Sequence, residues 1–336
     1  MSATIKDVAE RAGVSPATVS YVLNQSAPVS DRTRERVLKA VAELDYRPSY
    51  QGRSLRGRHS RTIGVVIPPE PDQVETLLPS PLLAGVAAAI AAAGYHLLIC
   101  STEPNDEREL YRDLIATGRV DGLIVLAPQR NDPRLIQLAE LQLPHTCLGR
   151  PPRWSAAPAA GRDLRAGALR AVGYLAHQGH QRIALIQEVS DRADALDWYI
   201  GYRRALRGAG IPFRSELVIE GGPGIGSGYS AMETLLSHSE PPTAVLACSE
   251  ELTFGALAAA ADAGLSVGSD LALIASGDSL AAVSAQPPLT TLRWPDRAIG
   301  YALGELIIAA IAGTAVRRFV AFIPQLMVRA STAASG

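Results

Sequence analysis

This 336-residue sequence contains only three cysteines, no long apolar run and no apolar stretch at its N-terminus. Cys100, Cys147 and Cys248 lie far apart in apolar segments, which favours reduced core thiols over a disulfide framework or a metal site. The longest apolar run, Leu82–Gly94, is shorter than the roughly 18 residues that a membrane span needs. Residues 1–7 contain no apolar stretch that could serve as a signal peptide. We therefore expect a cytoplasmic protein with no membrane partner.

The motifs that carry common enzyme chemistry are also missing. The glycine tract Gly221–Gly228 follows an apolar strand, but no frame gives Gly-x-Gly-x-x-Gly and no Lys-Ser/Thr pair follows. The six histidines include no HxxxH or HxH pair, and no Gly-x-Ser-x-Gly elbow occurs. The sequence thus predicts no catalytic residue, no metal site and no cofactor. A sugar hydrolase or dehydrogenase with an added N-terminal domain stays open as an alternative.

The charge is divided unevenly along the chain. Apolar residues make up 47% of the sequence and the net charge is −1, which fits two or three folded domains without indicating a partner. Residues 1–61 hold 11 basic and 6 acidic residues (net +5), whereas the remainder holds 21 basic and 27 acidic residues (net −6). A basic head on an acidic body predicts a polyanion partner for the head, although a solvated basic arm would show the same charge.

The first fifty residues predict a helix-turn-helix. Thr4 followed by Asp7 forms a capping pattern for a first helix, and Gly13 supplies the turn that ends it. Ser15 can cap a second helix, with Pro16 at its first position. A third helix is expected from Ser30 onward. The apolar positions expected to face the core are Val19, Val22, Leu23, Val37, Leu38, Val41 and Leu44.

From Thr62 onward, short apolar runs alternate with Ala/Leu-rich segments. The expected strands are Ile63–Ile67, His96–Cys100, Gly122–Leu126, Ile183–Ile186, Ala244–Ala247 and Leu271–Ala275. The expected helices between them include Leu82–Ala93, Ala166–Ala176 and Gly255–Ala263. Continuous apolar strands that alternate with helices predict parallel sheets covered on both faces, and hence an α/β fold.

Particular residues resemble the lactose-repressor (LacI/GalR) family of bacterial transcription regulators. In the head these are Thr4–Ala9, Ala12–Ser15, Thr18–Ser20, Val22–Asn24, Val29–Ser30, Tyr46–Pro48 and Arg53–Leu55. The body continues the resemblance at Gly179–Ile183 and Pro287–Thr291. The resemblance spans nearly the whole chain. It implies a homodimeric regulator, expected to be a repressor, that binds a near-palindromic DNA operator and responds to a small-molecule effector.

The resemblance also implies the domain organisation. Residues 1–48 would form the three-helix DNA-binding head, and residues 49–61 a hinge helix or linker. Residues 62–336 would form a periplasmic-binding-protein-like body for effector binding and dimerisation, with two doubly wound parallel α/β lobes. Lobe one would hold residues 62–160 and 290–320, and lobe two residues 161–289 with the C-terminal segment. The helix at Leu82–Ala93 would supply dimer contacts.

The same resemblance assigns the DNA contacts. It places base readers at Pro16, Ala17 and Tyr21, where the family often has arginine at the third position. The positions expected near phosphates or in support of them are Thr4, Ser15, Thr18, Ser20, Asn24 and Arg53. Leu55 matches the leucine that the family inserts into the minor groove, and Gly52 stands where an alanine is usual.

The effector positions depart most from the family pattern. Trp198 replaces an arginine and Trp294 a glutamine, while Ser249, Gly277 and Asp278 fall in turns that have lost other polar groups. Because buried sugar hydroxyls need partners, these changes predict an effector other than a typical sugar. One interpretation is a pocket refitted for a flatter, more aromatic effector, with the tryptophans as stacking surfaces. The other is a degenerate cleft in a regulator that answers to no small molecule.

Overall fold

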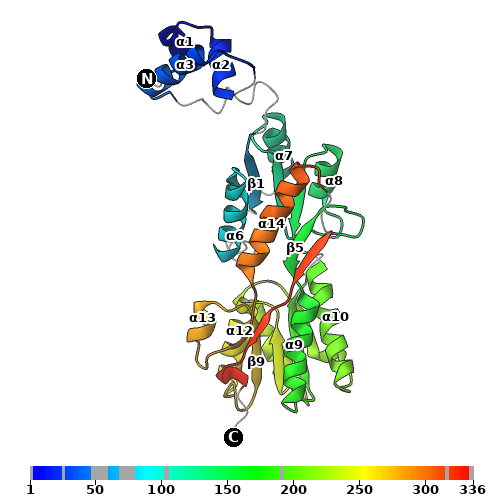
Figure 1. Ribbon diagram of the computed structural model, residues 1–336. Coiled ribbons are helices and arrows are strands. Elements are labelled where there is room, and N and C mark those ends of the chain that lie inside the picture. Colours follow the sequence, from blue (N-terminus) through cyan, green and yellow to red (C-terminus); the bar gives the residue numbers. More distant parts are fainter. Residues whose placement is uncertain are drawn as a thin grey trace. The chain divides into compact units, whose positions relative to one another are not determined.

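The computed structural model describes residues 3–24, 27–46, 60–67, 80–101, 106–189, 193–314 and 318–332. The chain divides into two compact units (Figure 1). One contains Met1–Ser60 with Ala116–Arg119 and is called the head. The other contains Arg61–Ile115 with Val120–Gly336 and is called the body.

Three helices form the head: α1 (Ile5–Ala12), α2 (Pro16–Asn24) and α3 (Asp31–Glu43). The predicted cap of α1 is confirmed as a capping box, since Thr4 N–H donates to the Asp7 carboxylate at 2.7 Å and Asp7 N–H donates back to Thr4 Oγ1. The predicted cap of α2 is also confirmed, because Thr18 N–H donates to Ser15 Oγ at 3.1 Å. These caps are local, so they fix where the helices begin without help from the body.

The core of the head corrects one prediction. Val19, Val22 and Val37 are buried as expected, but Leu38 is 49% exposed and Ala40 takes the inward position instead. The reason is helical phase: positions 37, 40, 41 and 44 share one face of α3, whereas position 38 lies about 100° further round. Arg36 joins α3 to the end of α1 by donating from Nη2 to the Gly13 carbonyl at 2.9 Å.

The first lobe of the body contains a parallel six-stranded sheet in the order β11-β5-β4-β3-β1-β2. Its strands are β1 (Thr62–Ile67), β2 (His96–Ser101), β3 (Gly122–Leu126), β4 (His145–Leu148), β5 (Ala159–Arg162) and β11 (Phe319–Phe322). Its helices are α6 (Ser80–Ala92), α7 (Glu107–Ala116), α8 (Pro133–Glu140) and α14 (Asp296–Ile311). Two apolar clusters, one with α6 and α14 and the other with α7 and α8, cover opposite faces of the sheet.

The second lobe contains a six-stranded sheet in the order β12-β10-β9-β8-β6-β7, parallel except at β12. Its strands are β6 (Ile183–Glu188), β7 (Val218–Gly221), β8 (Ala244–Ala247), β9 (Ala272–Ser276), β10 (Thr290–Arg293) and β12 (Gln325–Met327). Its α-helices are α9 (Leu164–His177), α10 (Ala193–Gly208), α11 (Ile225–Leu236), α12 (Glu250–Asp262) and α13 (Leu280–Ser284). Short 3-10 turns lie at Ser215–Leu217 and Ala330–Thr332. The predicted fold class is confirmed.

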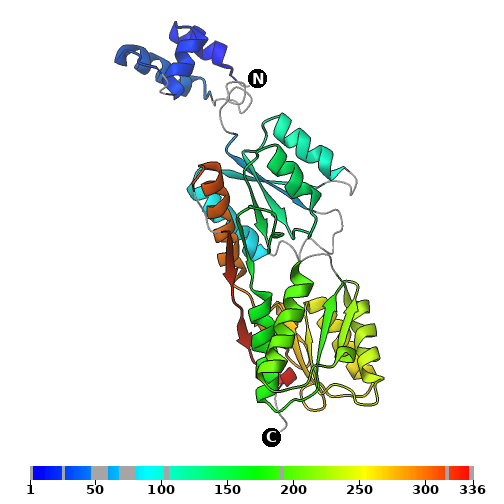
Figure 2. The same cartoon turned by 90° about the vertical axis from the view of Figure 1, so that its right-hand side faces the viewer.

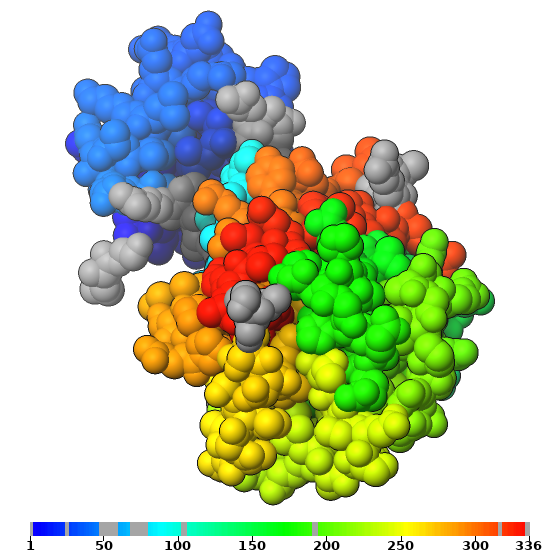
Figure 3. Space-filling view, turned by 90° about the horizontal axis from the view of Figure 1, so that it is seen from below, coloured from blue at the N-terminus to red at the C-terminus, as the bar shows by residue number. Residues whose placement is uncertain are grey.

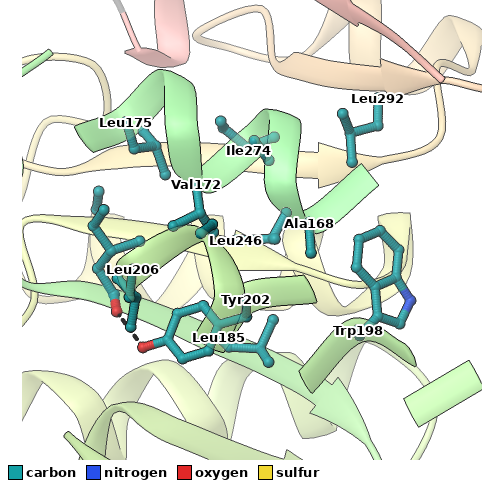
Figure 4. Packing of buried hydrophobic residues seen from close by; sticks show 14 of the residues in the cluster. Ala168, Val172, Leu175, Leu185, Trp198, Tyr202, Leu206, Leu246, Ile274 and Leu292 are labelled. Carbon is teal, nitrogen blue, oxygen red and sulfur yellow. Dashed lines mark hydrogen bonds between the residues drawn. The ribbon is translucent and has the colours of Figure 1, made fainter. Parts of the chain in front are cut away.

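Helices α9 and α10 cover one face of the second sheet (Figure 4). Tyr202 on α10 is fully buried there, and its hydroxyl donates to the Ile183 carbonyl at 2.7 Å. Trp198, one turn earlier on α10, closes the same cluster at the end of the sheet that faces the other lobe. One helix thus joins the core of the lobe to the region between the lobes.

The chain passes between the two sheets three times, after β5, after β10 and after β11 (Figure 2). Strand β10 pairs with β9 through Thr290 opposite Ile274. The chain therefore leaves the second sheet after Arg293, although the boundary expected from the sequence was residue 290. Because the two threonines that begin β10 interrupt any apolar run, the apolar pattern does not mark this strand.

Helix α6 packs tightly against α14 within the first lobe. A Cβ at Gly85 would lie 2.1 Å from the Arg297 carbonyl oxygen, and one at Gly300 would lie 2.0 Å from the Leu82 carbonyl oxygen. These glycines allow the two backbones to touch. The opposite face of α6, at Ala84 and Ala88, is exposed. Within the described ranges, no helix is both long and apolar enough to cross a membrane.

Candidate DNA-binding helix and inter-lobe cleft

The predicted DNA-contacting residues of the head gather on the outer face of α2. Ser15 and Pro16 are exposed, Tyr21 is 41% exposed, and Ala17 and Thr18 are half-buried. Ser20 is half-buried as well. Since the inward residues of α2 hold it against α1 and α3, this face is free to enter a major groove in the manner of a helix-turn-helix. The individual base and phosphate contacts stay predictions.

Several predicted positions lie outside the described residues. These are Arg53, Leu55 and Gly52 with the whole expected hinge at 49–59, and the side chain of Asn24. The backbone of Asn24 ends α2. The minor-groove role of Leu55 therefore rests on the family resemblance alone.

Two cavities lie along the boundary between the lobes. The larger, called the groove, has a volume of about 1690 Å³ and extends from the loops of the second lobe along α14. The smaller, called the chamber, has a volume of about 160 Å³ and is walled by both lobes. Its first-lobe wall includes Leu148, Gly149, Gly161 and Arg162. Its second-lobe wall includes Gln187, Glu188, Asp194, Trp198, Cys248 and Ser276.

The predicted effector residues all line these cavities. Trp198 lines the chamber, Ser249 lines both cavities, and Gly277, Asp278 and Trp294 line the groove. The structure thus brings together residues that are almost one hundred positions apart in sequence. Their contacts with a ligand stay predictions, because most of them also have structural partners.

The two tryptophans are core residues as well as cavity walls. Trp198 and Trp294 are 4% and 6% exposed, and their rings meet edge to face with centroids 6.3 Å apart. Trp294 Nε1 donates to Ser276 Oγ at 3.1 Å. The Arg162 guanidinium lies 5.6 Å from the Trp294 ring centroid and pairs with Asp296 at 2.9 Å.

The Asp278 carboxylate already has hydrogen-bond and ion-pair partners within the protein. Its carboxylate accepts hydrogen bonds from Thr291 Oγ1 at 2.6 Å and Arg293 Nε at 2.5 Å, and pairs with Arg329 at 2.6 Å. Burial alone would raise the pKa of Asp278, but these hydrogen bonds and the nearby arginine charge outweigh it and lower the pKa. A ligand that used this carboxylate would have to compete with three partners, two from β10 and one from the segment after β12.

Ser249 and Gly277 also support the local backbone structure. Ser249 Oγ caps α12 by accepting from Leu252 N–H at 3.3 Å. Gly277 has φ 121°, and a Cβ there would lie 2.7 Å from Glu250 Oε1. The same Glu250 oxygen accepts from Ser279 N–H at 2.7 Å, so it holds the loop between β9 and α13.

The sequence analysis missed an ion-pair cluster that joins the lobes. Arg150 follows β4 in the first lobe, and its Nε lies 2.8 Å from Asp197 Oδ2 on α10 of the second lobe. Arg165 on α9 contacts the other carboxylate oxygen at 2.6 Å. Asp197 is only 4% exposed. The two arginines and the aspartate are distant in sequence, so no local pattern could have indicated the cluster.

A second missed residue is Gln187, at the end of β6. It is 2% exposed, and its Nε2 donates to Glu220 Oε1 at 2.7 Å. Its Oε1 has no hydrogen-bond partner among the residues that the structure describes. The signal available in the sequence was a polar residue directly after the apolar run Ile183–Ile186.

The chamber does not have the features of a reactive or metal-binding centre. Burial, with the charge of Glu188 adding to it, raises the pKa of the Cys248 thiol well above its usual range, so the thiol is neutral. Across the part of the chain that the structure describes, no group of three or more His, Cys, Asp or Glu side chains could hold a metal ion.

Comparison with protein families gives two matches. Residues 4–49 match the model for bacterial regulatory proteins of the lacI family, and residues 172–332 match a periplasmic binding protein-like domain. An HTH-type transcriptional repressor PurR from Vibrio atlanticus (strain LGP32) is 32% identical over 315 residues, covering 92% of each chain. A second PurR repressor, from Erwinia tasmaniensis, is 34% identical and covers 89% of this chain and 87% of its own length.

Solved structures of similar fold are regulators too. The chain matches a complex of the transcriptional regulator CelR with cellobiose at TM-score 0.75 and 31% identity, over 98% of this chain and 99% of the other. It matches the lac repressor dimer bound to operator and the anti-inducer ONPF at TM-score 0.84 and 28% identity, over 99% and 100%. Both matches span the head and the body together.

Proposed function

Because this chain belongs to the LacI family of bacterial regulatory proteins, we propose that it represses transcription by binding a near-palindromic operator as a homodimer, under control of a small-molecule effector. The observation that carries the proposal is the outer face of α2. It presents short polar side chains and Tyr21 on a helix held by two others, as major-groove recognition requires.

The head supplies two kinds of DNA contact in this proposal. Pro16, Ala17 and Tyr21 read base edges, while Thr18 and Ser20 fix the register on phosphates. The net charge of +5 over residues 1–61 provides the sequence-independent attraction, which weakens steeply with salt. Leu55 from each subunit wedges the central base step open, so specificity depends on the paired hinges as well as on α2.

The effector acts by favouring one arrangement of the two lobes. The cavities between the lobes are lined from both sides, so a ligand there binds the two lobe arrangements with different affinity. The Arg150–Asp197 pair joins the two lobes at 2.8 Å, and separation of the lobes would break it. Differential binding of this kind is all that coupling to the heads through residues 49–61 requires.

The dimer surface includes the exposed faces of α6 and α13. Leu280 on α13 is 81% exposed, more than any other large apolar side chain in the described part, and Ala84 and Ala88 line the outer face of α6. Figure 3 shows α13, in orange, standing at the edge of the second lobe. Apolar and small side chains of this kind suit close approach of a second subunit.

The test is selection of binding sites from random duplex DNA by the purified full chain, followed by affinity measurement at increasing salt. We expect an enriched near-palindrome of two half-sites and an affinity that falls steeply as salt rises. Recovery of no common sequence, with only salt-dependent binding to any duplex, would contradict a sequence-specific regulator.

A further inference from the structure

The chain enters the body through Arg61, whose backbone has an unusual conformation. Its φ is 51°, in the left-handed region, although it is not a glycine. A residue with a Cβ rarely adopts this region because the Cβ crowds the following carbonyl oxygen, so neighbouring groups must hold it there. Ser60 and Thr62 are each 8% exposed, which leaves Arg61 as an exposed residue between two buried ones. The backbone direction directly before β1 is therefore set at this residue.

The starts of the two neighbouring strands hold Arg61 in place. Its N–H donates to Asp121 Oδ2 at 2.9 Å, directly before β3. Its carbonyl accepts from His96 N–H at 2.8 Å, at the start of β2, and Asp121 N–H donates to the Thr62 carbonyl at 2.8 Å. The two bonds between backbone groups belong to the parallel ladders of β1 with β2 and β3. The Asp121 carboxylate is an added acceptor that fixes residue 61 itself.

The Arg61 side chain lies against the body as well. A Cβ at Gly94 would lie 2.8 Å from Arg61 Nη1, so the guanidinium occupies space that the glycine leaves open. Burial and the charge of Asp121 raise the pKa of Tyr95, and the charge of Arg61 lowers it, so both charges lie near the Tyr95 hydroxyl. A hydrogen bond to a charged acceptor is stronger than one to a neutral group, so this carboxylate can hold a backbone conformation that is unfavourable by itself.

We propose that Asp121 is a positioning residue for operator recognition, because its hydrogen bond to Arg61 fixes the direction in which the chain leaves the body toward the head. The proposal rests on the proposed function, in which the two heads of a homodimer bind two half-sites at once. The separation of half-sites that a dimer accepts is a geometric property of the protein. A fixed direction at residue 61 of each subunit narrows the range of accepted separations, and so it adds discrimination between operators without a contact to any base.

The experiment compares operators that differ only in the separation of their half-sites. The probes are the duplex recovered by site selection and two versions with one base pair added or removed at the centre, which turns one half-site by about 35° relative to the other. Fluorescence anisotropy with the full-length protein gives the affinity for each duplex. We expect Asp121→Ala to lower the affinity for the selected duplex by about tenfold, and its preference over the altered duplexes by a similar factor, since each subunit loses a charge-assisted hydrogen bond.

Two further variants separate positioning from stability. Asp121→Asn keeps an amide oxygen that can accept from Arg61 N–H, so it should retain most of the preference for the selected separation. Asp270→Ala is the matched control, because Asp270 is an exposed carboxylate of the second lobe that accepts from Ser266 N–H at 2.8 Å. This substitution removes the same kind of bond. It should leave the preference for the selected separation unchanged, whatever happens to the melting temperature.

Hydrogen exchange without DNA tests the contact itself. The Arg61 amide should be protected in the unsubstituted protein and should exchange at least about tenfold faster in Asp121→Ala. An unprotected Arg61 amide in the unsubstituted protein overturns the proposal.

Operator binding separates this proposal from the broader one. Weaker binding of all three duplexes by the same factor in Asp121→Ala, or an equal loss of preference in Asp270→Ala, would show that Asp121 has only a structural role and would leave the regulator intact. Failure of the unsubstituted protein to select any DNA sequence contradicts the proposed function and this role together.

Discussion

The helix caps of the head and the polar contacts beside the chamber join residues at very different distances along the chain. In the head, Thr4 pairs with Asp7 and Ser15 with Thr18, each three residues apart. Around the chamber, Gln187 pairs with Glu220 and Arg150 with Asp197, from different elements or lobes. The caps of the head therefore form within single segments, whereas the contacts beside the chamber require separate elements or lobes to lie together.

The largest expected effect concerns Leu55, which the family resemblance assigns to the minor groove. Leu55→Ala should lower specific operator affinity by about 100-fold or more while leaving binding to unrelated duplex nearly unchanged, because the wedge acts only at a kinked site. Fluorescence anisotropy on operator and scrambled DNA measures both. Leu55→Met, which keeps an apolar wedge, is the control. Equal loss on both duplexes would show that Leu55 is not a wedge.

A smaller effect is expected for Tyr21, on the outer face of α2. Tyr21→Ala should lower operator affinity by about tenfold and relax preference at one position of each half-site, since a single base contact is removed. The check is repeated site selection with the variant, beside Tyr21→Phe to separate the hydroxyl from the ring. An unchanged sequence logo would remove Tyr21 from the base readers.

Removing the Asp197 carboxylate from the inter-lobe ion-pair cluster should lower the stability of the body without affecting the head. Asp197→Asn leaves Arg150 and Arg165 without a carboxylate, and because both arginines are partly exposed we expect a loss of only about 1–2 kcal/mol. The melting temperature should fall by a few degrees. Hydrogen exchange of α1 to α3 should be unchanged, and increased exchange there would show that the head depends on the lobe arrangement.

The smallest effect is a pH dependence from Asp278. Its pKa is lowered in the folded protein, so its contribution to stability is present above the unfolded pKa of about 3.9 and is lost as pH falls through the folded value. Between about pH 5 and pH 3, the unsubstituted protein should therefore lose stability more steeply than Asp278→Asn. If the melting temperatures of the two proteins fall equally steeply with pH in this range, Asp278 does not contribute to the acid sensitivity of stability.

Strands that are continuously apolar were predictable because their burial on both faces leaves a run of apolar residues. Gly122–Leu126 and Ala244–Ala247 have the same bounds in the sequence analysis and in the structure. Strands β4, β5 and β10 are short and contain His145, Arg162 or paired threonines, so no such run marks them. Leu38 shows the limit for helices, since two adjacent apolar positions leave the phase of the buried face ambiguous.

The sequence by itself determined the capped helices of the head, the α/β class of the body and the family to which the chain belongs. Each of these depends on interactions within a few residues or on the periodicity of apolar positions. Tertiary structure alone decided which side chains bind the Asp278 carboxylate and that Asp197 joins the lobes. It also decided that Gln187 Oε1 has no hydrogen-bond partner among the described residues. The physical reason is that satisfaction of a buried polar group depends on which distant elements lie against it, and no local pattern records that.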